Sequence, residues 1–249
     1  MTARIKLLNG EFDPLTLDGT VSEIFRMIEQ RRSGWIATVN VAILMMMRDS
    51  EFLQSFADRA ALVVADGQPL VWLSKLWGRP LPERVAGVEM VDAVCARAAQ
   101  SGHGVYLLGA TDAVIQEVTS RLRRRYPRLR IACSDGYFNT DQAAQRVADI
   151  RAKQTDILFV GMGVPRQETF IESNLAALGV GAAIGVGGSF DVLSSLRKRA
   201  PAWVQGIGME WMFRLLQEPR RLFARYMVTN ARFVGLVIRH LFAGRSAGR

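Results

Sequence analysis

The sequence contains few of the residues that form disulfide bonds or bind metal ions. Only two cysteines and two histidines occur among 249 residues. Cys95 and Cys133 have neither a Cys-x-x-Cys spacing nor a partner at ligand spacing, which disfavours a disulfide and a zinc site. His103 and His240 are isolated in the sequence and are expected to be structural or exposed. This cysteine usage favours a reducing, cytoplasmic setting.

Long hydrophobic runs are also missing. No stretch reaches the roughly 18 uninterrupted apolar residues that indicate a membrane-spanning helix. The segment from Met1 to Lys6 turns polar within a few positions and has no apolar signal-peptide core. We therefore expect a chain that is neither exported nor membrane-spanning. The composition, 49% hydrophobic and 22% charged, is that of a globular protein, and it excludes disordered, collagen-like and disulfide-scaffold classes.

Three familiar phosphate and metal motifs are absent. The first predicted strand leads into Asn9-Gly10-Glu11-Phe12 rather than into G-x-G-x-x-G, and Gly161-x-Gly163 is followed by Arg166 where a third glycine is needed. The missing dinucleotide fingerprint weakens the prediction of an NAD enzyme, and the missing Walker pattern weakens that of a P-loop ATPase. No Asp-x-Asp pair is present to bridge a divalent ion to a diphosphate. We therefore expect chemistry without a metal or a resident cofactor.

Acidic residues are scarce near the C-terminus. Residues 196–249 contain 11 of the 32 Lys and Arg but only Glu210 and Glu218 of the 23 Asp and Glu, which leaves 21 of each sign in residues 1–195. The net charge of +9 therefore belongs entirely to the last segment. We predict a neutral body over 1–195 and a basic appendage over 196–249, whose expected partner is an anionic surface such as phospholipid or nucleic acid.

The pattern of the appendage favours phospholipid. If Pro219 opens a helix, Arg221, Arg225, Arg232 and Arg239 fall within about 40° of one another on a helical wheel. The other side is apolar, as in a helix that lies at a membrane interface. The alternative is a terminal helix packed on the core with its arginines in water. A nucleic-acid site is less favoured, because the aromatic residues fall mostly on the apolar face rather than among the basic residues.

The body alternates short apolar strands with amphipathic helices. This alternation predicts an α/β fold with a mostly parallel sheet flanked by helices. The predicted strands are Ile5–Leu8, Trp35–Val39, Ala61–Ala65, Val105–Leu108, Arg130–Cys133, Ile157–Val160 and Ala182–Val186. The predicted helices cover about 20–32, 41–58, 69–77, 88–101, 111–125, 141–153, 166–177 and 206–217. Such sheets bind ligands beyond the carboxyl ends of their strands.

Two of these strand ends carry polar residues suited to chemistry. Thr38 and Asn40 end one strand, and the alternative for Asn40 is a simple helix cap. Asp66-Gly67 ends the next, where a carboxylate precedes a residue that permits close backbone approach. A capping or turn aspartate is the alternative there.

Glycine turns follow two other strands and point to a nucleotide. Gly161-Met162-Gly163 leads into a helix whose first-turn amides favour phosphate oxygens. Gly187-Gly188 repeats the feature, with Asp191 placed to hold a ribose hydroxyl. Gly136-Tyr137 follows another strand, where the aromatic ring is suited to stack on a base, with a packed loop equally compatible.

A diphosphate leaving group without a metal needs fixed donors and positive charge. Arg84 is one candidate and the helix start at Arg166-Gln167 is another. The alternative for Arg84 is an ion pair with Glu83 or another acid.

These residues together resemble the WecG/TagA/CpsF glycosyltransferases, in order from about residue 5 to 225. The matching segments are Thr38-x-Asn40, Ala65-Asp66-Gly67, Glu83-Arg84-Val85-x-Gly87, Leu108-Gly109, Tyr126-Pro127, Asp135-Gly136-Tyr137-Phe138, Val160-Gly161-x-Gly163-x-Pro165-x-Gln167-Glu168, Gly185-Val186-Gly187-Gly188-x-Phe190-Asp191, Arg199-Ala200-Pro201-x-Trp203 and Glu210-Trp211-x-x-Arg214-Leu215-x-x-Glu218-Pro219-x-Arg221.

The resemblance implies a Rossmann-like enzyme of surface-polysaccharide synthesis (exopolysaccharide, teichoic acid or a related glycan) on the inner face of the cytoplasmic membrane. It implies inverting, metal-independent transfer of a hexose or N-acetylhexosamine, of the N-acetylmannosamine or glucose type, from a UDP-sugar to a polyprenyl-diphosphate-linked saccharide. It also implies an appendage that reaches the membrane and supplies arginines to the active site. Off the membrane, the exposed apolar appendage would favour self-association.

The resemblance also assigns residues. Asp66 matches the family's proposed general base, which removes the proton of the attacking acceptor hydroxyl. Thr38 and Asn40 match positions that line the same pocket, and Arg84 and Gln167 match polar positions near the acceptor and phosphates. Arg214 and Arg221 match the appendage arginines. One departure is Ser194-Ser195, where family members usually carry Ala-Gly.

Two other classes of function compete with the transferase. A non-catalytic UDP-sugar-binding component of a polysaccharide assembly complex predicts UDP binding that is indifferent to Asp66. A basic nucleic-acid-binding protein predicts an affinity for DNA or RNA that depends strongly on salt.

Overall fold

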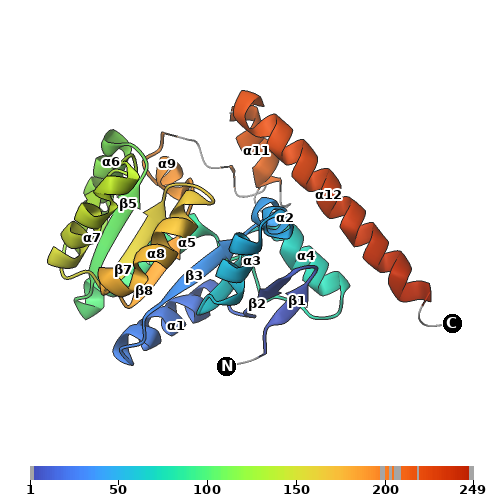
Figure 1. Cartoon of the computed structure of the whole chain (residues 1–249), viewed down its shortest axis with the longest axis horizontal. Coiled ribbons are helices and arrows are strands. Elements are labelled where there is room, and N and C mark those ends of the chain that lie inside the picture. The colour runs from blue at the N-terminus through green and yellow to red at the C-terminus, as the bar shows by residue number, and fades with distance from the viewer. Residues whose placement is uncertain (1–2, 197–199, 202–203, 205–208, 218, 247–249) are drawn as a thin grey trace.

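The protein is built around one parallel β-sheet (Figure 1). The computed structural model describes residues 3–196, 200–201, 204, 209–217 and 219–246, in parts of the C-terminal segment only as backbone. The sheet has six strands in the order β4-β3-β8-β7-β5-β6, and every neighbouring pair is parallel. The strands are β3 (Gly34–Val39), β4 (Leu62–Ala65), β5 (Gly104–Gly109), β6 (Arg130–Ser134), β7 (Ile157–Gly161) and β8 (Ala182–Gly185). This is the Rossmann-like α/β fold that the sequence predicts.

Helices cover both faces of the sheet because its central strands are apolar on both sides. β3, β5, β7 and β8 are buried along their whole length. Two hydrophobic clusters follow from this arrangement, one on each face. The helices on one face are α1 (Leu17–Glu29), α5 (Gly87–Ser101), α6 (Asp112–Arg125) and α9 (Ser189–Leu193). Those on the other are α2 (Val41–Asp49), α3 (Glu51–Asp58), α4 (Gln68–Leu76), α7 (Ala143–Ala152) and α8 (Arg166–Leu178), with the short 3-10 helix η1 (Thr140–Gln142) before α7.

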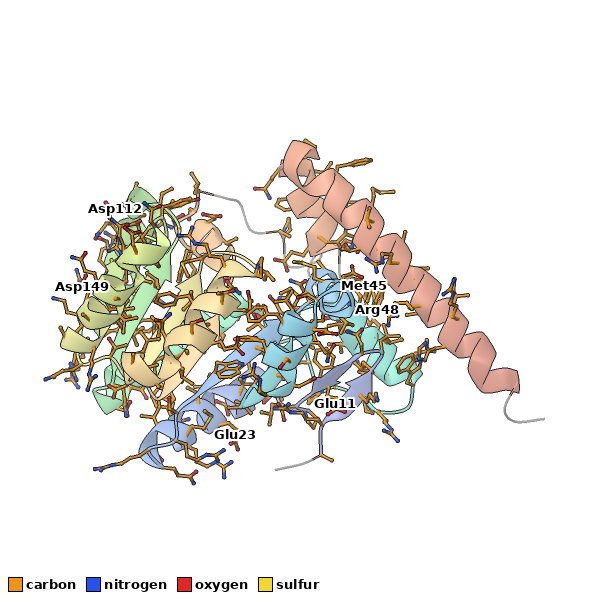
Figure 2. The ribbon with its side chains drawn as sticks, in the orientation of Figure 1. Glu11, Glu23, Met45, Arg48, Asp112 and Asp149 are labelled. Atoms are coloured by element: carbon orange, nitrogen blue, oxygen red, sulfur yellow. The ribbon has the colours of Figure 1, made fainter. Side chains whose placement is uncertain are left out.

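The side chains follow the expected division between core and solvent (Figure 2). Met45 on α2 is fully buried, whereas Glu11, Asp112 and Asp149 are exposed at the periphery. Trp35 shows how the cluster under α3 is fixed, because its ring stacks on Phe56 at 5.0 Å and its indole N–H donates to the Phe56 carbonyl at 2.9 Å.

Three local predictions are corrected. The first predicted strand is β1 (Ile5–Leu7), which pairs antiparallel with an unpredicted β2 (Gly10–Phe12) in a hairpin apart from the main sheet. The helix predicted over 41–58 is two helices, because Ser50 adopts an extended conformation and its hydroxyl accepts from the Leu53 N–H to cap α3. The short helix α9 was not predicted, since its five residues span little more than one turn.

The C-terminal segment forms α11 (Glu210–Gln217) and a long helix α12 (Pro219–Ser246), which begins at Pro219 as predicted. α12 crosses α2, where Arg232 makes two hydrogen bonds of 2.6 and 2.7 Å to the Asp49 carboxylate. This guanidinium holds the pKa of Asp49 below its ordinary value. Residues Phe233, Leu236 and Val237 pack against the core. Within the described residues, no helix combines the length and the apolar character needed to cross a bilayer.

The remaining side of α12 is apolar and exposed. Phe223, Met227, Val234 and Ile238 are between 46% and 57% exposed. They fall within an arc of about 60° on a helical wheel. α12 therefore packs on the body along one side, as the alternative interpretation predicts, although Arg232 is bonded to Asp49. Along another side it presents an exposed apolar stripe.

Candidate active site

The polar strand ends meet at the carboxyl edge of the sheet. β3 and β4 are neighbours, and the Asp66 N–H donates to the Val39 carbonyl at 2.9 Å. Gly67 lies beside Asn40, since a Cβ atom on Gly67 would be 3.7 Å from the Asn40 Cβ. The Val85 N–H donates to the Ala65 carbonyl at 2.9 Å, which brings the loop that carries Arg84 to the same place. The topology thus gathers Asn40, Asp66 and Arg84 from three separate segments.

Thr38 and Asn40 also have structural roles. The Thr38 hydroxyl is buried and donates to the Gly185 carbonyl at 2.7 Å, which ties β3 to β8. The Asn40 side-chain oxygen accepts from the Ile43 N–H at 3.1 Å and caps α2, as the alternative interpretation of the sequence has it. Asn40 is nonetheless only half-buried and lies beside Asp66-Gly67 at the edge of the sheet.

Arg84 connects this edge to the appendage. Its guanidinium pairs with Glu89 at 3.2 Å on α5 and with Glu210 on α11. The sequence left open whether Arg84 pairs with Glu83 or with another acid. Its partners are Glu89 and Glu210. The Glu83 carboxylate instead accepts a hydrogen bond from the Leu17 N–H at 2.6 Å. The Arg84 side chain is only 13% exposed, so this cation is held close to the body. The site and α11 are consequently coupled through one side chain.

Gln167 is buried rather than open to the edge. The side chain is 2% exposed, and its oxygen accepts from the Gly187 N–H at 3.0 Å. Its nitrogen donates to the neighbouring Glu168 carboxyl at 2.8 Å. Gln167 therefore joins the start of α8 to the loop that follows β8.

The glycines assigned to a nucleotide serve two different purposes. Gly136 and Gly161 allow backbones to approach, because a Cβ atom would lie 2.8 Å from the Gly109 Cα or 2.6 Å from the Phe190 ring. Gly163 and Gly187 instead have positive φ angles of 80° and 51°, with nothing within 4 Å of the Cβ position. Gly188 caps α9, the helix that carries the half-buried Asp191. The loops after β7 and β8 thus have open space at Gly163 and Gly187.

Tyr137 is 70% exposed on the loop after β6. The Asp135 carboxylate fixes this loop by accepting from the Tyr137 N–H at 2.9 Å and pairing with Arg146 at 2.7 Å. Arg166 donates to the Phe138 carbonyl at 2.6 Å from the start of α8. The Tyr137 ring is therefore an accessible aromatic surface on an anchored loop.

Part of the predicted site falls at the end of the described body. Arg214 and Arg221 belong to α11 and α12 by their backbones, but their side chains lie outside the described residues, as do Arg199 and Trp203. Ser195 adopts a φ of 62°, in the left-handed region that favours glycine. A glycine, which the resemblance leads one to expect near this position, would adopt this φ without strain, so serine carries a local conformational cost here.

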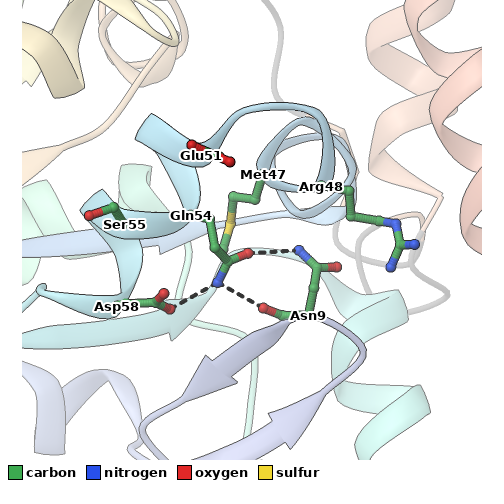
Figure 3. A pocket seen from close by; sticks show the side chains of 7 residues that line it. All are labelled: Asn9, Met47, Arg48, Glu51, Gln54, Ser55 and Asp58. Carbon is green, nitrogen blue, oxygen red and sulfur yellow. Dashed lines mark hydrogen bonds between the residues drawn. The ribbon is translucent and has the colours of Figure 1, made fainter.

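A hollow of about 500 Å³ lies away from the carboxyl edge, between the β1–β2 hairpin and helices α2 and α3 (Figure 3). Part of its lining is hydrogen-bonded, because Asn9 and Gln54 exchange hydrogen bonds and Gln54 also donates to Asp58 at 2.8 Å, whereas the buried Asn9 Oδ1 has no partner within the described structure. We place the active site at the carboxyl edge despite the size of this hollow, because the residues suited to chemistry converge there. Among the described residues, no group of three or more His, Cys, Asp or Glu is placed to share a metal ion.

Glu168 is the most perturbed carboxyl group beside the site. It is only 7% exposed, and burial raises its pKa to about 7. Its Oε2 atom has no hydrogen-bond partner within the described structure. The sequence motif contains Glu168, but an acid in the first turn of a helix is ordinarily interpreted as a partner of the helix dipole. Sequence reasoning therefore missed this residue, because its burial depends on helix packing.

The raised pKa of Glu168 predicts a pH-dependent stability. Between the ordinary pKa of 4.5 and the folded value of about 7, the folded chain keeps a proton that the unfolded chain has lost. Wild-type stability therefore falls as pH rises through this range. The Glu168→Gln variant lacks this titration. Its free energy of unfolding minus that of wild type should therefore rise by about 3 kcal/mol between about pH 4 and about pH 8. Urea unfolding of both proteins at the two pH values measures the shift, and a constant difference would contradict it.

Comparisons with known proteins identify the family of this chain. Residues 5–247 match the model of the Glycosyl transferase WecG/TagA/CpsF family. A Bacillus spizizenii protein named N-acetylglucosaminyldiphosphoundecaprenol N-acetyl-beta-D-mannosaminyltransferase is 36% identical over 86% of this chain and 82% of its own length. A protein of the same name from Staphylococcus aureus strain MW2 is 31% identical over 89% of this chain and 87% of its own length. With the family model and both relatives spanning nearly the whole fold, this chain belongs to the WecG/TagA/CpsF family of glycosyltransferases.

Proposed function

We propose that this chain transfers N-acetylmannosamine from its UDP conjugate to a polyprenyl-diphosphate-linked N-acetylglucosamine. The lipid-linked acceptor and the transferred sugar are those in the names of both relatives, which cover more than four-fifths of the chain. The observation that carries the proposal is the convergence of Asn40, Asp66 and Arg84 at the end of β3 and β4, beside the open glycine loops after β7 and β8. Family analogy supplies the choice of UDP.

In the proposed reaction, Asp66 is the general base. Its carboxylate takes the proton of the acceptor hydroxyl as the hydroxyl oxygen attacks the anomeric carbon of the donor. The new carbon–oxygen bond forms on the face opposite the breaking bond, so the configuration inverts. UDP leaves with the electron pair of the bond between the anomeric carbon and the β-phosphate oxygen. In this proposal Asn40 orients the acceptor, which is supported by its position beside Gly67, the residue after Asp66.

The charge that develops on the departing diphosphate needs nearby donors. In our proposal Arg84, the open loops after β7 and β8, and the arginines at 214 and 221 provide them without a metal ion. The Gly187 N–H is not among these donors, because it is bonded to Gln167. Arg84 would exchange a carboxylate partner for phosphate oxygens when the donor binds. Tyr137 offers an exposed ring for the uracil base.

We further propose that the chain divides into a catalytic body over 1–195 and an appendage over 196–249 that holds the enzyme on the inner face of the membrane. The exposed apolar stripe of α12 supports this division, because an apolar helix face needs a non-aqueous partner. The excess of 11 basic residues over 2 acidic residues in the appendage favours anionic lipid headgroups.

A transfer assay tests the proposal directly. Purified protein is incubated with a panel of UDP-sugars and a short-chain polyprenyl-diphosphate-linked N-acetylglucosamine, with and without EDTA, and products are identified by mass spectrometry. We expect a product with UDP-N-acetylmannosamine that persists in EDTA. Product with another sugar would correct the donor, and loss of product in EDTA would overturn the metal-free mechanism. UDP binding without any product would favour a non-catalytic component of an assembly complex.

A further inference from the structure

The loop after β8 is held by a chain of two hydrogen bonds, one buried and one half-buried, that begins at Glu168. The Glu168 carboxyl accepts from the Gln167 amide nitrogen, and the Gln167 amide oxygen accepts from the Gly187 N–H. These bonds measure 2.8 and 3.0 Å. All three groups lie between the start of α8 and the end of β8. The backbone of the Gly187-Gly188 loop is thus fixed by two consecutive side chains of one helix.

The packing at the end of β8 leaves this chain little freedom. A Cβ atom on Gly185 would lie 2.8 Å from the Gln167 amide nitrogen, so the amide sits directly against the strand. On the opposite side, the Thr38 hydroxyl holds the Gly185 carbonyl at 2.7 Å. Two residues later the Gly187 N–H donates to the Gln167 oxygen, and the positive φ of 51° at Gly187 turns the chain that follows. The strand end and the loop therefore form one hydrogen-bonded unit.

A glutamate at position 168 lowers the stability of the fold compared with an apolar residue of similar volume. The Glu168 side chain borders a cavity of about 20 Å³ whose other lining residues carry no ionisable group, among them Ile36, Ile43 and Phe56. A buried carboxyl in apolar surroundings destabilises the fold, and a methionine of similar volume would fill the same space without that cost. What methionine would not supply is an acceptor for the Gln167 amide.

A carboxyl group also determines which way the Gln167 amide points. Above its pKa of about 7 the carboxylate only accepts hydrogen bonds, so it selects the amide nitrogen, and the Gly187 N–H, which only donates, selects the amide oxygen. With the amide rotated by half a turn, its oxygen would face the carboxylate and its nitrogen would face the Gly187 N–H. Both hydrogen bonds would then be lost. The orientation seen at Gln167 is therefore the one that Glu168 favours.

We infer that Glu168 is a positioning residue for the donor site: it orients the Gln167 amide, which holds the Gly187-Gly188 loop in the conformation that receives the nucleotide diphosphate. The inference rests on the proposed function for the identity of the ligand. The geometry of the hydrogen-bonded chain does not depend on that identity.

The test compares Glu168→Met, which removes the acceptor at similar volume, with Glu168→Gln, which keeps an acceptor oxygen. We expect Glu168→Met to raise the KM for the UDP-sugar at least about tenfold, with the acceptor KM within about twofold of wild type. Glu168→Gln should restore the donor KM to within about threefold. Glu172→Met, on the same helix at the surface where Glu172 pairs with Arg59, serves as the matched control and should match wild type.

Hydrogen exchange gives a readout that does not require turnover. We expect the Gly187 amide to exchange at least about tenfold faster in Glu168→Met than in wild type, Glu168→Gln or the control, with exchange in β3 and β7 unchanged. If Glu168→Met does not yield folded protein, Gln167→Met breaks the same chain at its centre and must give the same result. If the wild-type protein transfers no sugar, the proposed function is refuted. Hydrogen exchange of the Gly187 amide would still decide whether Glu168 positions the loop.

Two outcomes would overturn the inference. One is unchanged exchange of the Gly187 amide in the methionine variant. The other is equal impairment of Glu168→Met and Glu168→Gln, because loss of the acceptor oxygen could then not be the cause.

Discussion

Replacing Asp66 by asparagine is expected to lower the turnover number at least about a hundredfold, the lower range for a lost general base. Asparagine has the same shape but cannot take the proton of the acceptor hydroxyl. The Asp66 N–H bond to the Val39 carbonyl belongs to the backbone and is retained. The fold and the affinity for UDP should therefore stay near those of wild type. Turnover is measured at saturating donor and acceptor, and UDP binding by calorimetry.

Asp149→Asn provides the matched control. Asp149 is exposed on α7, away from the carboxyl edge (Figure 2), and its replacement should leave turnover unchanged. Near-normal turnover of the Asp66→Asn enzyme would remove Asp66 from the mechanism. Loss of UDP binding in that variant would instead assign Asp66 to the donor site.

Replacing the exposed apolar stripe of α12 is expected to release the enzyme from membranes. Phe223, Met227, Val234 and Ile238 are about half exposed. Burying the exposed part of each in a bilayer interface should contribute roughly 1 kcal/mol, on the scale of apolar transfer. Changing all four to glutamine should then weaken binding to anionic vesicles at least about a hundredfold. Co-sedimentation with vesicles of phosphatidylglycerol measures the change.

A water-soluble acceptor separates membrane binding from catalysis. With a short-chain acceptor and no vesicles, the glutamine variant should retain turnover to within about threefold, because the stripe faces away from the packed side of α12. A chain ending at residue 195 should lose vesicle binding. It should also lose sugar transfer, because it lacks α11 and with it Glu210, the partner of Arg84. Undiminished sedimentation of the glutamine variant would show that the stripe has another partner.

Much of the architecture is readable from the sequence. Apolar runs such as Ile157–Val160 are buried on both faces, and only strands inside a sheet covered by helices on both sides meet that requirement. Every predicted strand occurs in the structure, and Pro219 begins a helix as its fixed φ angle favours. The charge asymmetry of residues 196–249 is likewise a property of the sequence alone.

The tertiary structure decided which side chains meet. Arg84 pairs with Glu210, 126 residues away, rather than with its neighbour Glu83, because the course of the chain brings α11 to the carboxyl edge. Gly136 and Gly163 both lie just after a strand, yet one packs against a neighbouring backbone and the other faces open space.

Glu168 gives the physical reason for this division. Its place in the first turn of a helix predicts a solvated carboxylate, but the packing of α8 on the sheet buries it and raises its pKa to about 7. Local sequence patterns encode the periodicity of burial, and with it the strands, the helices and the order in which they follow. Burial of an individual polar group, and the partner it finds there, depend on residues distant in sequence, so only the folded chain determines them.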